Sequence, residues 1–131
     1  MLRGDAVPPP TGLAAVVEAD EVMGLQEAAD RVRAEESVLD YLVALVTATR
    51  RSPLLALGVS PRGSLALLRA ARARALADGR DYLLPDDIKE LAVSALAHRV
   101  MVKASLSGSA VGGMDAEAAV AAILQDVPVP R

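Results

Sequence analysis

The chain has 131 residues, 53% of them hydrophobic, and its 14 Lys and Arg against 17 Asp and Glu give a formal net charge of −3. This apolar content offsets the entropy of ordering the chain, so the composition predicts one folded core and excludes an intrinsically disordered segment. The acidic balance argues against general nucleic-acid binding, and the lack of cysteine with a single histidine excludes disulfides and cysteine or multi-histidine metal sites.

The first 17 residues are predicted to form a linker. The consecutive prolines Pro8 to Pro10 fix their own φ angles and push the preceding residues out of the helical region. Together with Asp5 they interrupt the apolar run that a signal peptide needs, and no later run approaches the roughly 18 residues that span a bilayer. We therefore expect a cytoplasmic protein without membrane insertion. Residues 1–17 would lead in from a missing upstream domain, 18–126 would form one helical domain, and 127–131 a C-terminal tail.

From Glu18 onward, apolar residues recur at spacings of three and four, which is typical of amphipathic helices, and the alternation of strands is absent. This pattern predicts an all-α fold, a four-helix bundle with a short accessory helix at the C-terminal end. The five helices are predicted at about residues 20–33, 35–51, 61–78, 85–99 and 115–126, with an apolar loop at 54–57.

Each predicted helix has an apolar face that we expect to point into the core. The inward residues are predicted to be Val22, Leu25, Ala29 and Val32 in the first helix, Val38, Leu42, Leu45 and Val46 in the second, Leu65, Leu68 and Leu76 in the third, Ile88, Leu91, Ala92, Ala95 and Leu96 in the fourth, and Ala116, Ala119, Val120, Ile123 and Leu124 in the fifth.

The third helix has the clearest ends. Ser60 is a good N-cap, Pro61 suits the first helical position, and Gly79 stands where a left-handed residue would stop the helix. The fourth helix begins at Pro85 after Leu84, whose side chain has no oxygen to accept a hydrogen bond from a free amide. Its N-terminal cap is therefore predicted to be imperfect.

Arg62, in the first turn of the third helix, is the most informative residue. The free amides of that turn already make the local potential positive, so a cation is normally disfavoured there. An arginine beside a helix N-terminus favours an anion, and phosphate suits the paired donors of a guanidinium. Gly58 and Gly63 would permit close backbone approach. A solvated surface arginine is the alternative, and Arg69, near Arg62 on the helical wheel, is either solvated too or widens the same anion site.

A second arginine of this helix, Arg72, falls between the predicted inward leucines on the helical wheel. A charge in that position needs a partner, and Asp86 or Asp87 at the start of the next helix would provide one. We favour this structural ion pair over contact with a ligand. Arg74 and Arg80 are interpreted as part of a solvated face.

No residue pattern here indicates catalysis. His98 lies near a helix C-terminus, where a cation is favourable, and no serine or acid around it forms a nucleophile motif. The glycine-rich segment from Gly108 to Gly113 is predicted to be a flexible loop, and it lacks the Gly-Lys-Ser/Thr ending and preceding strand of a phosphate-binding loop. We therefore predict no catalytic residue and no metal site within this chain, which by itself is not an enzyme.

Several short blocks nevertheless follow one another in a recognisable order. They are Leu-Gly-Val-Ser-Pro-Arg at 57–62, Ala-Arg-Ala-Arg-Ala at 71–75, Gly-Arg-Asp-Tyr at 79–82, Pro-Asp-Asp at 85–87 and His-Arg-Val at 98–100. In this order and spacing they resemble the C-terminal lid domain of the MoxR family of AAA+ ATPases, over roughly residues 16–102. Leu84 departs from the family pattern, which has threonine before Pro-Asp-Asp, and Val59 replaces a usual alanine.

The resemblance implies a specific role for the Ser-Pro-Arg block. In this family its arginine, here Arg62 after Ser60 and Pro61, is the sensor 2 residue that reaches the γ-phosphate of ATP. ATP and Mg²⁺ would be held by an upstream AAA+ core of the same polypeptide, and neither is expected to bind tightly to this chain alone. Family members form homo-oligomeric rings, usually hexamers, and act as chaperone-like remodelers, often beside partners with von Willebrand factor A domains.

Two other classes of function remain open from the residues alone. A free-standing helical adaptor for protein interactions would dock partners through the apolar loop at 54–57 and the alanine-rich helix faces. A helix-turn-helix DNA-binding protein would use the arginines of the third helix, but the acidic balance and the scarcity of lysine disfavour it.

Overall fold

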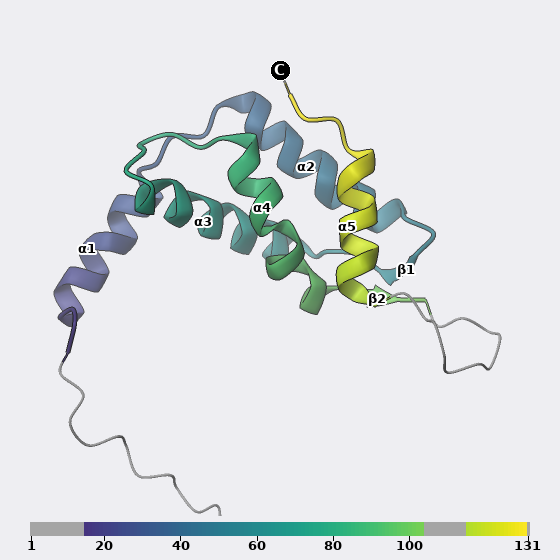
Figure 1. Cartoon of the computed structure of the whole chain (residues 1–131), viewed down its shortest axis with the longest axis horizontal. Helices are drawn as coiled ribbons and strands as arrows, with labels where there is room; N and C mark the ends of the chain where they lie inside the picture. Colours follow the sequence, from purple (N-terminus) through teal and green to yellow (C-terminus); the bar gives the residue numbers. More distant parts are fainter. Residues whose placement is uncertain (1–14, 104–114, 131) are drawn as a thin grey trace, which may run out of the picture.

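The computed structural model describes residues 15–103 and 115–130 and is mostly helical (Figure 1). The helices are α1 (Ala19–Asp30), α2 (Glu36–Arg51), α3 (Pro61–Ala77), α4 (Pro85–Leu96), the short 3₁₀ helix η1 (Ala97–Arg99) and α5 (Ala116–Asp126), and the strands are β1 (Leu55–Leu57) and β2 (Met101–Val102). The predicted all-α class is confirmed. Most of the predicted linker and the whole Gly108–Gly113 segment lie outside the described residues.

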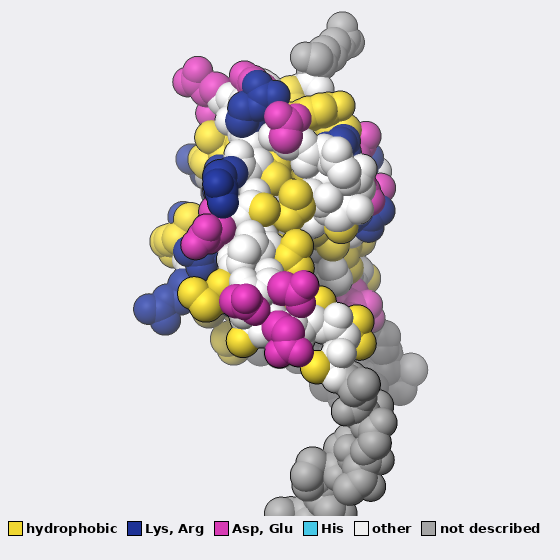
Figure 2. Space-filling view, turned by 90° about the vertical axis from the view of Figure 1, so that its left-hand side faces the viewer, with side chains coloured by type: hydrophobic (Ala, Val, Ile, Leu, Met, Phe, Trp, Pro, Cys, Tyr) yellow, Lys and Arg dark blue, Asp and Glu magenta, His cyan; other side chains and the backbone are white. Residues whose placement is uncertain are grey.

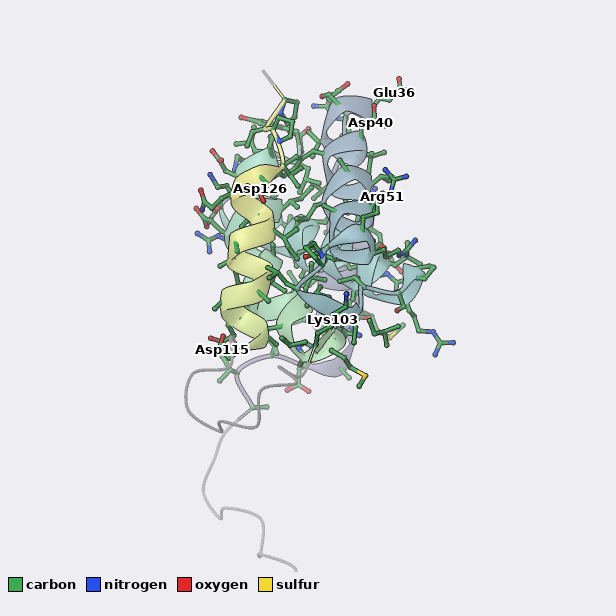
Figure 3. The ribbon with its side chains drawn as sticks, turned by 90° about the vertical axis from the view of Figure 1, so that its right-hand side faces the viewer. Glu36, Asp40, Arg51, Lys103, Asp115 and Asp126 are labelled. Carbon is green, nitrogen blue, oxygen red and sulfur yellow. The ribbon has the colours of Figure 1, made fainter. Side chains whose placement is uncertain are left out.

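Helices α2 to α5 surround one core, and α1 lies at the end of the molecule against α3 (Figure 1). Each of the four contributes fully buried side chains: Leu45 from α2, Leu67 from α3, Ile88 and Leu96 from α4, and Val120 from α5. Helix α5, predicted as an accessory, is part of this core and runs beside α2 between Asp115 and Asp126 (Figure 3). None of the described helices is both long and apolar enough to cross a membrane.

The predicted inward face of α2 is correct, and that of α4 is buried at Ile88, Ala92 and Leu96 and half-buried at Leu91 and Ala95, but the most buried face of α3 is not the predicted one. Leu65 is 58% exposed and Leu68 and Leu76 are only half-buried, whereas Leu67, Ala71 and Ala75 are fully buried. The buried positions recur every four residues, and the small side chains of Ala71 and Ala75 let α3 pack closely on α4. Because leucines and alanines lie on more than one face of α3, its hydrophobic spacing alone did not distinguish this alanine face from the leucine face.

The predicted burial of the first helix is also wrong. No residue of α1 is buried, and Val22 and Leu25 are 38% and 55% exposed. Val32 is buried as expected but lies beyond the helix, which ends at Asp30. Figure 2, which faces this end of the molecule, shows hydrophobic side chains at the surface between acidic and basic ones. Helix α1 therefore adds little to the core.

The predicted apolar loop at 54–57 contains a strand instead. Strands β1 and β2 are antiparallel, with Leu55 opposite Val102 and Leu57 opposite Met101, and the Lys103 N–H donates to the Leu54 carbonyl at 3.0 Å. A three-residue strand is too short to show alternation, and its partner lies beyond α3 and α4 in the sequence. The pairing fixes the chain that leads into α3 against the chain that leaves η1.

Both ends of α3 are as predicted. The Ser60 hydroxyl accepts a hydrogen bond from the Gly63 N–H at 3.3 Å, and Gly79 has φ +75°. The Gly79 N–H donates to the Leu76 carbonyl and the Arg80 N–H to the Ala75 carbonyl, which is the Schellman pattern. Only glycine adopts this left-handed conformation without strain, so the helix ends here and the chain turns towards α4.

The buried ion pair lies beside α4, but its cation is Arg80 and not the predicted Arg72. The Arg80 guanidinium donates to both carboxylate oxygens of Asp87, at 2.6 and 2.8 Å, and Asp86 is exposed. The turn after Gly79 carries Arg80 to the first turn of α4, which the helical wheel of α3 could not show. The Nε of Arg72 is buried and has no hydrogen-bond partner among the described residues.

The same carboxylate completes the start of α4. The Leu84 side chain provides no hydrogen bond, as predicted, but the Leu84 N–H donates to Asp87 at 2.8 Å. Burial on its own raises the pKa of Asp87, but the hydrogen bonds from Arg80 and from Leu84 outweigh it and hold that pKa below its usual value. Arg74, interpreted as solvated, forms ion pairs with Asp78 at 3.1 Å and Glu90 at 3.4 Å.

Candidate functional site

The candidate site lies where α3 begins. Arg62 is the second residue of α3, its side chain is exposed, and within the described part of the chain it forms no salt bridge. The first turn of α3 contains no acidic residue. Ser60 caps the helix and Pro61 occupies its first position. The guanidinium of Arg62 is therefore available at the positive end of a helix.

The end of α2 holds the chain just before this turn. The Thr49 hydroxyl accepts a hydrogen bond from the Val59 N–H at 3.0 Å and donates to the Val46 carbonyl at 2.7 Å. The Arg50 Nε donates to the Val59 carbonyl at 2.7 Å. Sequence reasoning assigned no role to Thr49 or Arg50. The one available signal is a threonine at a core-facing position of an otherwise apolar helix face.

The two glycines of this segment pack against the protein itself. A Cβ on Gly58 would lie 2.6 Å from the Arg50 Cα and 2.7 Å from the Thr49 carbonyl carbon. A Cβ on Gly63 would lie 2.6 Å from Cγ1 of Val59. Both glycines thus allow close packing within the protein: Gly58 sets the β1–α3 connection against α2, and Gly63 sets the first turn of α3 against Val59. The predicted close approach to a phosphate stays a prediction.

A shallow depression of about 580 Å³ adjoins the start of α3. Its lining residues are Arg50, Ala56, Leu57, Gly58, Val59, Ser60 and Arg99. Arg99 packs on the first turn of α3, with its Cδ 3.5 Å from the position of a Cβ on Gly63, and its Nε donates to the Ala95 carbonyl at 3.1 Å. Cations from the end of α2 and from η1 thus lie near the N-terminus of α3, and together they produce a positive potential that attracts anions.

The other predicted site residues lie elsewhere. Arg69 is about two turns further along α3 and lines a separate depression with Gln26, Ala29, Asp30 and Ala73. His98 is exposed on η1. Within residues 15–103 and 115–130, no three His, Cys, Asp or Glu side chains gather in a way that could hold a metal ion.

Comparisons with known proteins identify the family of this fold. The AAA lid domain family matches residues 47–123. The chain is 44% identical over 115 residues to "Uncharacterized protein YeaC" of Bacillus subtilis, covering 88% of this chain and 35% of that protein. It is 35% identical over 96 residues to "Chaperone MoxR1" of Mycobacterium tuberculosis, covering 66% of this chain and 26% of that protein.

A solved structure has the same fold. It is the crystal structure of a "putative ATPase" from Cytophaga hutchinsonii, with a TM-score of 0.75 and 29% identity, covering 86% of this chain and 36% of the other. This chain thus spans about a third of the length of that ATPase and of the Bacillus relative. The chain belongs to the AAA lid domain family and is a lid domain of the MoxR-family AAA+ ATPases.

Proposed function

We propose that Arg62 is the sensor 2 residue of a AAA+ ATPase, and that it contacts the γ-phosphate of ATP bound in an upstream core of a longer protein. The observation that carries this proposal is the exposed guanidinium of Arg62 in the first turn of α3, with no carboxylate in that turn. A cation at a helix N-terminus costs about 0.3–1 kcal/mol, so fold stability does not account for this arginine. A bound anion does.

The described frame around Arg62 supports the proposal. Its helix is capped by Ser60, starts on a proline and is held to α2 through Val59, so the guanidinium projects from a fixed base. ATP offers a γ-phosphate that ADP lacks, and a contact made with only one of them shifts the equilibrium between lid orientations. The lid would thereby couple nucleotide state to movement of the protein.

The remaining chemistry belongs to the proposed whole protein. An upstream core would hold ATP and Mg²⁺ and provide the attacking water, while this chain would contribute no catalytic residue besides the phosphate contact. We propose a cytoplasmic homo-oligomeric ring, a hexamer as is usual in the family, with chaperone-like remodelling activity and a von Willebrand factor A domain protein as partner.

The structure gives less support to the adaptor alternative. Its expected docking surfaces were the apolar segment at 54–57 and the alanine-rich helix faces. The segment is paired with β2, with Leu55 buried and Leu57 58% exposed, and the alanines Ala71, Ala75 and Ala92 are fully buried. The lid function needs no such free surface.

Steady-state ATP hydrolysis by the complete protein tests the proposal. At saturating ATP, Arg62→Ala is expected to lower kcat by about tenfold or more, which corresponds to about 1.4 kcal/mol of transition-state stabilisation. Arg31→Ala, which removes another exposed arginine far from α3's first turn, is the matched control and should leave kcat unchanged. Equal rates for native protein and Arg62→Ala, with equal assembly, would refute the sensor role.

A further inference from the structure

We propose that Thr49, together with Arg50, is a positioning residue that sets the direction in which α3 presents Arg62. This inference rests on the proposed sensor role of Arg62, because it assigns to the end of α2 the task of holding that arginine in place. Its basis is the connection between α2 and α3, where two consecutive side chains hold both polar groups of Val59.

The Thr49 hydroxyl joins two segments by hydrogen bonds. Thr49 is 0% exposed, and its single hydroxyl donates within α2 to Val46 and accepts from the Val59 N–H across the connection. Val59 is 1% exposed, so its N–H has no water to replace a lost partner. A valine at position 49 would fill nearly the same volume but leave that N–H unpaired. The hydroxyl, and not the bulk of the side chain, is what fixes Val59 to α2.

The connection has little freedom beyond Val59. Arg50 holds the Val59 carbonyl at 2.7 Å, and only Ser60 and Pro61 separate Val59 from Arg62. Ser60 is fixed by its cap to Gly63, and proline has a restricted φ. A displacement at Val59 is therefore passed on to Arg62, where a shift of about 1 Å relative to a reacting group is enough to slow a reaction severely.

Kinetics of the complete ATPase test this inference with four variants: Thr49→Val, Thr49→Ser, Arg62→Ala and the double variant Thr49→Val with Arg62→Ala. We expect Thr49→Val to lower kcat by about fivefold to tenfold, and Thr49→Ser, which keeps the hydroxyl, to stay within about twofold of the native rate. In the Arg62→Ala background, Thr49→Val should cause no further loss of kcat, because the residue it positions is gone. Ile88→Val, a buried change in α4 away from the connection, controls for general loss of stability.

The outcomes separate this inference from the proposed function. If Arg62→Ala is slow and Thr49→Val is native-like, or if Thr49→Val lowers kcat equally with and without Arg62, Thr49 is not a positioning residue and the sensor role stands. If Arg62→Ala has the native kcat, the sensor role of Arg62 is refuted, whatever the result for Thr49→Val.

A measurement on this chain tests the positioning itself without any ATPase activity. In ¹⁵N-labelled protein, Thr49→Val should move the backbone amide signals of Ser60 to Ser64 and the Nε–H signal of Arg62, while Thr49→Ser and Ile88→Val should leave them in place. Unmoved signals in Thr49→Val would overturn the inference, whatever the kinetics show.

Discussion

Position 58 requires a glycine because the chain packs closely against the backbone of α2 there, and not because a ligand binds. The atoms nearest to an added Cβ are main-chain atoms of Thr49 and Arg50, at 2.6 to 2.7 Å, and main chain cannot rotate aside as a side chain can. Any larger residue would push the β1–α3 connection away from α2 and strain the two hydrogen bonds to Val59. The sequence motif around Arg62 therefore serves packing at its glycine and, by our proposal, nucleotide contact at its arginine.

Gly58→Ala is accordingly expected to destabilise the protein by about 1–3 kcal/mol, the usual cost of overpacking, as measured by chemical denaturation. Gly24→Ala is the matched control, because an added Cβ there meets nothing within 4 Å on the exposed face of α1. It should be neutral or stabilise by up to about 1 kcal/mol. Equal stability of the two variants would show that the connection yields more easily than its contacts indicate.

At the scale of elements, α3 and α4 are joined by an ion pair that also caps a helix. Asp87 accepts hydrogen bonds from Arg80 and from the Leu84 N–H, so one carboxylate stabilises the turn after α3 and the start of α4. Removing it would leave Arg80, whose side chain is only 19% exposed, with Asp78 at 3.1 Å as its remaining counter-charge.

This pair predicts a specific pH dependence. Because the folded-state pKa of Asp87 is depressed, its contribution to stability is present above the unfolded pKa of about 3.9 and is lost as the pH falls through the folded value. Denaturation midpoints of native protein and Asp87→Asn should therefore differ at neutral pH and converge in acid. A difference that stays constant from neutral pH into acid would contradict the assigned charge state.

The same elements show how far sequence reasoning reached. Caps and stops were predictable because they depend on a few neighbouring residues, as with Ser60 and Gly79 at the ends of α3. The buried face of α3 and the partner of Asp87 were not predictable from the sequence, because both depend on how close α3 and α4 lie and on where the turn between them leads. The hydrophobic periodicity predicts that a segment is helical, but it does not predict which other segments that helix packs against.

For the whole molecule, the fold class was predictable and the packing of its ends was not. The exposure of α1 and the pairing of β1 with β2 follow from contacts between segments distant in the sequence, which no local pattern records. Of the candidate site, Arg62 was identifiable from a local inconsistency, a cation at a helix N-terminus. The role of Thr49 and Arg50 was not identifiable, since it appears only when α2 and the β1–α3 connection are placed together.

The central claim, that Arg62 contacts the γ-phosphate, is tested most directly by the affinities of the complete protein for ATP and ADP. Titrations with the non-hydrolysed analogue of ATP and with ADP would be compared between native protein and Arg62→Ala. We predict that Arg62→Ala weakens binding of the ATP analogue by about tenfold, or 1.4 kcal/mol, and leaves the affinity for ADP unchanged. An equal effect on both nucleotides, or none on either, would contradict the contact.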